Sequence, residues 1–545
     1  MSRARLALPL ALSFAIPCPL AAAPQGGVEV QEFEPPDGQA GDGFGYRVER
    51  AGKVAVVAST YDDDLGLDSG SVYVYLSDPL LGWQLAQKRH ASDGAAGDSF
   101  GYSVAVDGER VLVGAPGHDG ATSDCGALYV FARNQGGVGN WGEVARFAPQ
   151  GLAPGAGFGY SLAVRGEHLL VGAPHHARGV AGRAYLYRRD AASASGWTLE
   201  LDFTSADPAT AFEFGQDVAL GDGLLAVSGA RTSIQPYSDT YAVHLYERDA
   251  RGAGGWNEVR RLESPSGTRD IFGYEIALDG DLLVAVAPAE IDFASLQVGA
   301  LYLYRRALGG ASNWGLERRL VDPQVDGFFT PDEVDVEGDW IAAGSFSSSA
   351  EDVLSAGAVS VFGRNAGGKD AWAAVARLTD EEPTAGAYFG LDLALEEDEL
   401  LVGAPGQYSG AASGEVYVLD LARVPRATWR NDAAGRNPDV HRAETRPWLG
   451  TNYVAEVDLG GTGHTTAVLV LYAHAAELAL PGGRVRLGST PLGRAVASGP
   501  LARFQFALPA DSSLSGLALS TQARLVGGGR PYALSNAQDL VLGFP

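Results

Sequence analysis

Cysteine, methionine and positive charge are all scarce in this chain of 545 residues. Its two cysteines are Cys18, in an N-terminal apolar stretch, and Cys125, so a disulfide framework is excluded. We expect Cys125 to be an exposed thiol without a chemical role. The 40 Lys and Arg residues stand against 66 Asp and Glu, which gives a formal net charge of −26. This charge opposes binding to nucleic acid, whose phosphates are also anionic.

Long apolar runs are absent after Ala23, so we expect no membrane span. The N-terminus combines Arg3 and Arg5 with an apolar stretch from Leu6 to Leu20 and with Ala21-Ala22-Ala23. This order of charged, apolar and small residues is typical of a secretory signal peptide. The sequence therefore predicts an exported protein, secreted or held at the cell surface.

Catalytic motifs are almost absent as well. Gly97 to Gly101 (GDSFG) matches G-x-S-x-G, but a nucleophile elbow needs a strand-to-helix turn, and this segment leads into a strand. No His-Glu-x-x-His, phosphate loop or dinucleotide fingerprint occurs. We therefore expect a protein that is not an enzyme, with a site assembled from distant loops as the alternative.

A segment of short strands, Gly97–Phe131, is the unit from which most of the chain is built. Apolar and strand-forming residues predict its strands, and the next run adds a fourth: Phe100–Val106, Val111–Ala115, Ala127–Phe131 and Trp141–Phe147. Asp107-Gly108 is predicted to form a tight hairpin with two positive φ angles.

The unit recurs seven times, with nearly constant spacing between successive phenylalanines. Six units carry a Phe-Gly pair and one has Phe329 with the glycine lost; the phenylalanines are Phe44, Phe100, Phe158, Phe214, Phe272, Phe329 and Phe389. A long fixed period with four strands per unit is the mark of a β-propeller. The sequence therefore predicts an all-β fold with a seven-bladed propeller.

The fourth strands indicate how the ring closes. Each of the first six units is followed by a strand that begins at a tryptophan, but nothing similar follows the seventh. An alternating run, Val28–Phe33, stands before the first unit instead. We expect this N-terminal run to complete the last blade and so remove an open sheet edge.

The Phe-Gly and Gly-Ala-Pro elements resemble the FG-GAP repeat, known from the propeller of integrin alpha subunits and from bacterial surface proteins. The resemblance covers Val28 to Leu421 and implies a seven-bladed propeller. Integrin-type repeats often hold calcium in a long loop between their first and second strands. Here that loop has shrunk to hairpins such as Asp107-Gly108, so the calcium residues of the family have no equivalent positions.

Weaker metal candidates are Asp62, Asp64 and Asp68, in the loop after the second strand of the first unit. Their spacing matches part of a calcium loop without its closing glutamate. A solvated Asx-rich loop is the favoured interpretation. We therefore predict no cofactor and leave calcium open, and we expect Glu396–Glu399 to be only a solvated turn.

The repeated aromatic residues are expected to pack between blades, because they hold one place in every unit. Loop residues outside the repeat pattern are better candidates for ligand contact at the surface: His118, His175, His176, Arg178, Tyr237 and Tyr408.

The repeat pattern ends after Leu421. We predict a signal peptide over residues 1–23, the propeller over 24–424 and a second domain over 428–545. Alternating apolar runs split by Gly and Pro predict a small β-sandwich there. Its ending, Leu534–Phe544, resembles a C-terminal domain of secreted planctomycete-type bacterial proteins.

These features favour a binding or adhesion scaffold that presents propeller loops to an extracellular protein or polysaccharide. Different loops on one rigid disc form a broad contact surface with little ordering cost. Two alternatives remain: a hydrolase or lyase with its site at the channel mouth, and a structural surface or matrix protein. Fold alone does not choose among them, and the oligomeric state stays open.

Overall fold

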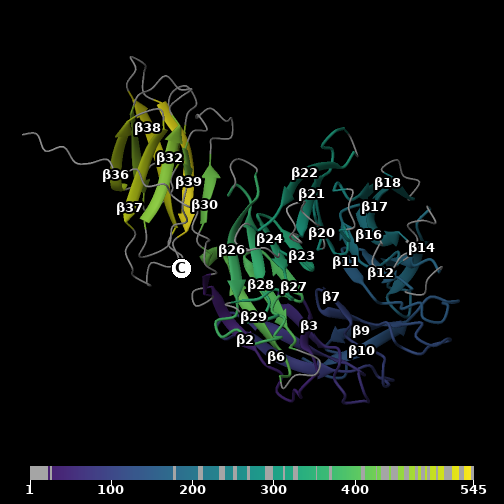
Figure 1. Ribbon diagram of the computed structural model, residues 1–545. Coiled ribbons are helices and arrows are strands. Elements are labelled where there is room, and N and C mark those ends of the chain that lie inside the picture. The colour runs from purple at the N-terminus through teal and green to yellow at the C-terminus, as the bar shows by residue number, and fades with distance from the viewer. Residues whose placement is uncertain are drawn as a thin grey trace, which may run out of the picture.

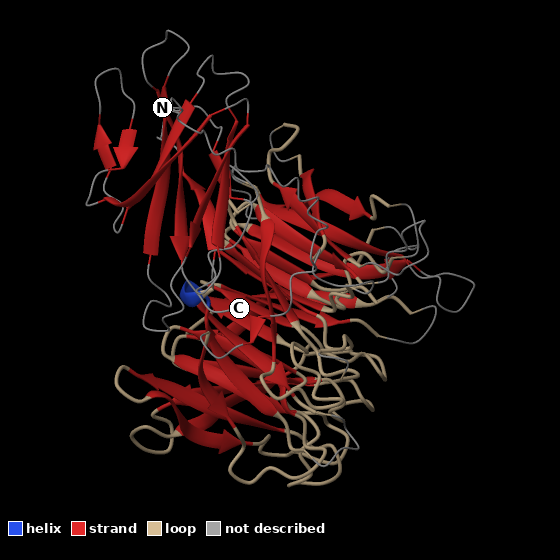
Figure 2. Cartoon of the chain, turned by 60° about the vertical axis from the view of Figure 1, so that its left-hand side comes forward, coloured by secondary structure: helices blue, strands red, loops and turns tan. Residues whose placement is uncertain are grey.

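Figures 1 and 2 show a chain built almost wholly of strands, in a computed structural model that describes two β-rich regions. In the N-terminal region it describes residues 23–24, 28–175, 180–206, 213–231, 240–249, 255–266, 270–288, 299–310, 313–322, 329–350, 353–366, 371–406 and 412–424. In the C-terminal region it describes the strands between residues 426 and 541. Within these residues, no helix is long and apolar enough to cross a membrane.

Seven antiparallel sheets of the N-terminal region form the blades of a propeller, as predicted. The first three blades are Phe44–Ala51 (β3), Val54–Ser59 (β4), Ser71–Asp78 (β5) and Gly82–Arg89 (β6); Ser103–Asp107 (β7), Arg110–Ala115 (β8), Ala127–Arg133 (β9) and Trp141–Phe147 (β10); and Leu162–Arg165 (β11), His168–Ala173 (β12), Arg183–Arg189 (β13) and Trp197–Phe203 (β14).

The next three blades continue the pattern. They are Val218–Gly221 (β15), Leu224–Arg231 (β16), Thr240–Arg248 (β17) and Trp256–Glu263 (β18); Ile276–Asp279 (β19), Leu282–Ala287 (β20), Ala300–Arg305 (β21) and Gly315–Leu320 (β22); and Glu333–Glu337 (β23), Trp340–Gly344 (β24), Val359–Gly363 (β25) and Ala373–Thr379 (β26). A short strand, Ala23–Pro24 (β1), pairs in parallel with β26.

The seventh blade closes with the N-terminal strand, which confirms the prediction from the strand count. Its own strands are Leu393–Glu396 (β27), Glu399–Ala404 (β28) and Glu415–Asp420 (β29), and its fourth is Glu29–Phe33 (β2). Glu32 is paired with Tyr417 and Phe33 with Val416. This pairing covers the edge of β29 that a linear array would leave open.

The repeat motif has a steric cause, because neighbouring blades touch through their backbones at its glycines. A Cβ on Gly114, in the Gly-Ala-Pro element of blade 2, would lie 2.0 Å from the carbonyl oxygen of Gly159, the Phe-Gly glycine of blade 3. The same contact closes the ring, where a Cβ on Gly403 would lie 2.1 Å from the oxygen of Gly45. Only glycine permits this approach.

The repeated phenylalanines are buried between blades, as expected. Phe100 and Phe158 are fully buried, and each packs edge-on against a tyrosine of the third strand. The sixth place is filled by Phe329, which is also buried and contacts Phe362. The role of these rings is therefore packing.

The hairpins between first and second strands are tight, but their turn differs from the prediction in one respect. Asp107 pairs with Arg110, so the turn residues are Gly108 and Glu109. Among these residues only Gly108 has a positive φ, of 60°. A single positive φ at the first turn position is the pattern of a II′ hairpin rather than of I′.

The C-terminal region is all-β and is linked to β29 through a short 3-10 turn, Leu421–Arg423 (η2). One antiparallel sheet contains Arg426–Arg430 (β30), Ala533–Val541 (β39), Ala518–Val526 (β38), Thr466–Tyr472 (β33) and Pro491–Ser498 (β36). The smaller sheets contain His441–Ala443 (β31), Asn452–Asp458 (β32) and Leu501–Ala507 (β37), and Glu477–Ala479 (β34) and Val485–Leu487 (β35). Alternate residues such as Ala455 and Val457 are buried, as in a sheet with one covered face. The planctomycete-type resemblance stays a prediction.

Candidate functional site: the central channel

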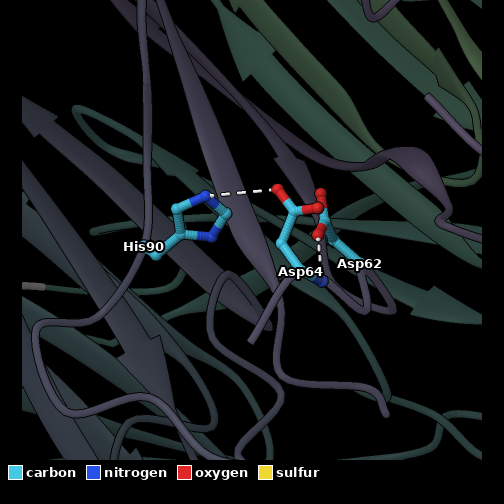
Figure 3. Close-up of side chains that lie close together, drawn as sticks. All are labelled: Asp62, Asp64 and His90. Atoms are coloured by element: carbon cyan, nitrogen blue, oxygen red, sulfur yellow. Dashed lines mark hydrogen bonds and ion pairs between the residues drawn. The ribbon is translucent and has the colours of Figure 1, made fainter. Parts of the chain in front are cut away.

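The predicted metal loop of blade 1 brings together two of its three aspartates. Carboxylate oxygens of Asp62 and Asp64 lie within 4.8 Å of each other and of a ring nitrogen of His90 (Figure 3). Asp68 does not join them; its backbone N–H donates to Asp63 instead. The sequence analysis missed His90, which lies on a different connection, between β6 and β7.

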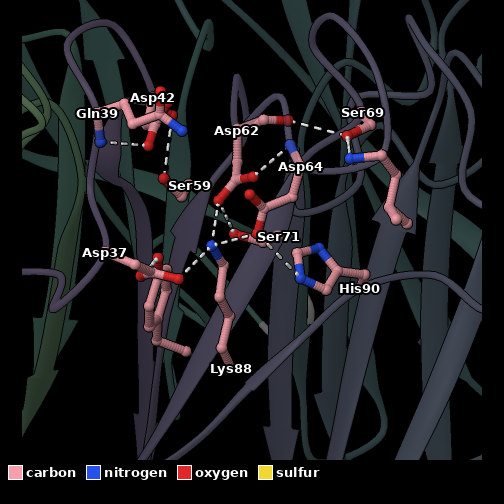
Figure 4. Close-up of polar contacts among 12 residues, drawn as sticks. Asp37, Gln39, Asp42, Ser59, Asp62, Asp64, Ser69, Ser71, Lys88 and His90 are labelled. Atoms are coloured by element: carbon pink, nitrogen blue, oxygen red, sulfur yellow. Dashed lines mark hydrogen bonds and ion pairs between the residues drawn. The ribbon is translucent and has the colours of Figure 1, made fainter.

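This loop cluster already contains a cation of the protein itself. Lys88 Nζ, on β6, lies 2.7 Å from Asp62, 2.8 Å from Asp64 and 2.9 Å from Asp37 (Figure 4). It also lies 5.2 Å from the centre of the Tyr73 ring. Burial lowers the pKa of Lys88, but these hydrogen bonds outweigh it and raise that pKa. One ammonium group therefore offsets part of the charge of these three aspartates.

Two of the predicted surface-contact residues are buried. His118 is 7% exposed, and its Nδ1 lies 3.2 Å from Asp98 and 3.4 Å from the Tyr129 hydroxyl. His175 is 8% exposed. The expectation that these two side chains are exposed is therefore wrong, whereas contact of either with a ligand stays a prediction. His176, Arg178, Tyr237 and Tyr408 lie outside the described residues.

Two further expectations are corrected in the same way. Cys125 is buried at 3% exposure rather than exposed. The Glu396–Glu399 turn is not merely solvated, because both glutamates pair with Arg50 of blade 1, at 3.0 and 2.6 Å. These ion pairs cross the seam where the ring closes.

The innermost strands enclose a central cavity of about 610 Å³. Each blade contributes one polar side chain at one level of its wall: Arg47, Ser103, Ser161, Asp217, Glu275, Glu333 and Asp392. These residues stand three places after the repeated phenylalanine, or four after Phe329. A polar residue at one fixed place in all seven repeat units is a signal that the sequence analysis passed over.

The preceding residue of each blade forms a second ring, nearer the end where the first strands begin. Tyrosine occupies four of its places, and the full ring is Tyr46, Tyr102, Tyr160, Gln216, Tyr274, Asp332 and Leu391. Tyr46, Tyr102 and Tyr160 are in contact, with ring centres 5.7 and 4.6 Å apart. Blades 1 to 3 therefore present an aromatic wall, and blades 4 to 7 present an acidic one.

Arg47 neutralises part of the acidic wall. One of its guanidinium nitrogens lies 2.8 Å from Asp392 and 3.6 Å from Glu333, and its Nε donates to the carbonyl oxygen of Tyr102. Burial raises the pKa of Glu333 and of Asp392, and Arg47 opposes both shifts. A hydrogen bond between Glu333 and Asp392 lowers the pKa of Asp392, so Glu333 is the proton donor in this pair.

A second carboxyl pair, Asp217 and Glu275, has no cation within ion-pair distance among the described residues, although the charge of Arg47 lowers the pKa of both groups. Burial raises the pKa of Asp217 to about 6, and burial and the Asp217 charge raise that of Glu275. A hydrogen bond links the two carboxyl groups and favours the charged form of Asp217. Glu275 therefore carries the shared proton and donates it to Asp217.

Three of the carboxylates also hold neighbouring blades together. The edge N–H groups of the innermost strands face the channel, where no strand can accept from them. Asp217 accepts from Ile276 N at 2.7 Å, Asp335 from Leu395 N at 2.7 Å and Asp392 from Val48 N at 2.5 Å. Each bond runs from one blade to the next, so these acids have a structural role.

Glu49 and Asp332, which also line the channel, lack such bonds to the next blade among the described contacts. Burial raises the pKa of Glu49 to about 8 and that of Asp332 to about 7. One carboxyl oxygen of Asp332 is buried without a hydrogen-bond partner in the part of the chain that the structure describes. The acidic wall thus holds more carboxyl groups than its resident cation and backbone donors satisfy.

The geometry defines this protein as a seven-bladed β-propeller, closed by its own N-terminal strand around a polar channel. Four segments match the sequence profile described as "FG-GAP repeat": residues 28–75, 83–131, 141–187 and 372–419. Each matched segment begins in or just before the fourth strand of one blade and ends in the third strand of the next. This offset between repeat and blade is what the closure requires.

Solved structures add only distant likenesses. Sqt1 from Chaetomium thermophilum is 10% identical, with a TM-score of 0.38 over 70% of this chain and 97% of that one. The β-propeller domain of the Trilobed protease from Pyrococcus furiosus is 8% identical, with a TM-score of 0.37 over 68% and 92%. A GH32 β-fructofuranosidase from Bombyx mori is 10% identical, with a TM-score of 0.26 over 81% and 87%. No curated protein matches the sequence. These likenesses carry no inference about activity.

Proposed function

We propose that this protein is an exported, non-enzymatic binding module that receives part of an extracellular protein or polysaccharide at the tyrosine-lined end of its channel. The observation that carries the proposal is the pair of rings around the cavity. Seven blades bring fourteen side chains, from distant parts of the chain, to two levels of one preformed space. A preformed cavity with aromatic walls and convergent polar groups is the usual form of a binding site.

Binding is favoured over catalysis by what the carboxylates contact. Asp217, Asp335 and Asp392 each accept a hydrogen bond from the backbone of the next blade. General acid–base catalysis needs a carboxyl group that is free to give and take a proton at the substrate. Groups committed to the packing of blades are poorly suited to that task.

A hydrolase with its site in the channel is the second candidate. Glycoside hydrolysis uses a protonated and an ionised carboxyl group about 5–10 Å apart, so the acid and the carboxylate would come from different pairs, Asp217 with Glu275 and Glu333 with Asp392. Incubation of every bound glycan with the protein, followed by product analysis, tests this candidate. Release of shorter glycans that is lost in Glu275→Gln would replace the binding proposal with the enzymatic one.

A screen of glycan and extracellular-protein arrays tests the binding proposal. We expect ligands of the wild type to be lost when Tyr102 is changed to Ala, because this half-buried ring forms the middle of the aromatic wall. Leu80→Ala, on an outer turn and 91% exposed, is the matched control and should bind as the wild type does. Equal binding by both variants, or no ligand on either array, would contradict the proposal.

A further inference from the structure

We infer that the channel binds a cationic group of its ligand, a primary ammonium or a guanidinium, between the Asp217–Glu275 pair and the tyrosine wall. The inference rests on the proposed function and names the chemistry that the site selects. Its support lies in three features of the cavity: an unbalanced acidic wall, a carboxyl oxygen without a partner among the described residues, and an aromatic wall opposite.

The imbalance appears when the two carboxyl pairs are compared. Arg47 lies against Glu333 and Asp392, so that pair has a cation within ion-pair distance. Asp217 and Glu275 have none within that distance among the described residues; Arg47 lowers the pKa of both from farther away, but burial outweighs it and raises both pKa values. The other arginine of the channel wall, Arg165, pairs with Asp222 at the hairpin end. One carboxyl pair of the acidic wall thus has a cation of the protein within ion-pair distance, and the other pair does not.

Asp332 marks the same half of the channel. It lines the cavity at the level of the second ring of residues, where four places hold tyrosine. Its charge and that of Glu275 both raise the pKa of Tyr274. Its Oδ2 is buried and has no hydrogen-bond partner in the described residues. A buried acceptor without a partner costs free energy, which an N–H donor from a ligand would recover.

The aromatic wall favours a cation over other donors. The faces of tyrosine rings attract ammonium and guanidinium groups, and more strongly where water is excluded. Tyr46, Tyr102 and Tyr160 line the cavity as one contiguous group. The guanidinium of Arg47 lies 5.5 Å from the centre of the Tyr46 ring, so a cation of the ligand would contact Tyr102 and Tyr160. An anion would be repelled by the acidic wall, and a neutral polyol would gain nothing from its charge.

Binding exchanges a proton for the cation. The ammonium keeps its own protons and donates hydrogen bonds to Asp217 and Glu275, and the proton that the pair shared passes to solvent. The titratable groups that face the pair across the cavity are Tyr46, Arg47, Tyr102, Tyr160, Tyr274, Asp332, Glu333 and Asp392. The pKa values of Tyr102, Tyr160, Tyr274 and Arg47 are all raised, which keeps these tyrosines neutral and Arg47 charged near pH 7, so the carboxyl groups set the pH dependence. Affinity should rise as pH rises through the raised carboxyl pKa values and fall as these groups are protonated.

Titration calorimetry of the full chain with diaminopentane tests the inference. We expect binding at pH 8 with net release of protons, measured as a heat that depends on the ionisation enthalpy of the buffer. Affinity should be about tenfold weaker at pH 5. Pentanediol, of the same length without charge, should not bind. No amine binding at pH 8, or equal binding of the diol, would overturn the inference.

Two variants locate the site. Glu275→Gln removes the shared proton and, unlike Asp217, has no bond to the next blade among the described contacts, so the fold should survive. It should lose amine affinity and proton release. A double variant of two outer acids, Glu109→Gln with Glu263→Gln, removes more negative charge than Glu275→Gln does and should bind as the wild type does. Equal loss in both would show that net charge, not the channel, attracts the amine.

The array result separates this inference from the proposed function. Array ligands that bind Glu275→Gln and the wild type alike, and that are lost in Tyr102→Ala, would overturn the cation site while the binding module stands. Array ligands that lose affinity in Glu275→Gln would support both.

Discussion

The loop cluster of blade 1 and the central channel both bring several carboxyl groups together, but they offset the negative charge differently. In the loop, one Lys88 ammonium lies within 2.9 Å of three aspartates. In the channel, Arg47 serves one carboxyl pair and a shared proton serves the other. A lysine is a permanent part of the chain, whereas a proton can be exchanged for a ligand. The loop is therefore suited to structure and the channel to recognition.

Removing the cation of the loop should have the largest effect. Lys88→Met leaves the buried Asp62 carboxylate without its counter-charge, and such a loss costs about 3–5 kcal/mol of stability. Urea unfolding of the variant measures it. Lys53→Met, an exposed residue of the blade 1 hairpin, should change stability by less than about 0.5 kcal/mol. Equal stability of the two variants would show that the aspartates do not depend on Lys88.

The channel should make stability depend on pH. Glu49 and Asp335 have pKa values raised to about 8 and about 7 by burial, so the folded state keeps protons that the unfolded chain gives up. Their contribution is fully present below the ordinary carboxyl pKa and is lost as pH rises from about 5 to 8. Thermal unfolding followed by circular dichroism should give a Tm that falls by several degrees over this range. A Tm that rises toward pH 8 would contradict the raised pKa values.

Neutralising a channel acid should cost little, in contrast to the loop. Glu275→Gln replaces a group that is already protonated, so at pH 5 its stability should lie within about 1 kcal/mol of the wild type. At pH 8 the variant should be the more stable of the two, because it has no proton to lose. Destabilisation as large as that of Lys88→Met would mean that Glu275 is an ionised structural group.

Calcium should have the smallest effect. The first-to-second strand hairpins are too short to wrap a cation that takes six to eight oxygen ligands, and the loop cluster is filled by Lys88. We expect excess EDTA and excess calcium to give Tm values within a few degrees of each other. Collapse of the propeller on chelation would reveal a structural metal site.

The fold could be predicted from the sequence, because the spacing of the repeats can be read directly from the positions of the recurring residues. Seven phenylalanines in register, six tryptophans and one alternating run before the first unit were enough to give the blades and their closure. The site was harder. Lys88 lies on β6 and Asp62 lies in the loop after β4, and no local sequence pattern indicates that their side chains form an ion pair. The burial of His118 and Cys125 was missed because a polar loop that folds back has the composition of an exposed one.

The channel rings could have been found, since their residues hold one fixed place in each unit. What the sequence could not state is which of them share a proton. That depends on the closed ring, which sets Glu275 of blade 5 beside Asp217 of blade 4 and leaves Arg47 of blade 1 nearer to blades 6 and 7.

Infrared difference spectroscopy tests the central claim most directly, because a protonated carboxyl group has a carbonyl stretch distinct from that of a carboxylate. Spectra of the wild type minus Glu275→Gln at pH 7 should contain a protonated-carboxyl band that disappears when diaminopentane is added. A difference spectrum with only carboxylate bands at pH 7 would show that Glu275 is ionised, and the channel would then hold no proton for a ligand to replace.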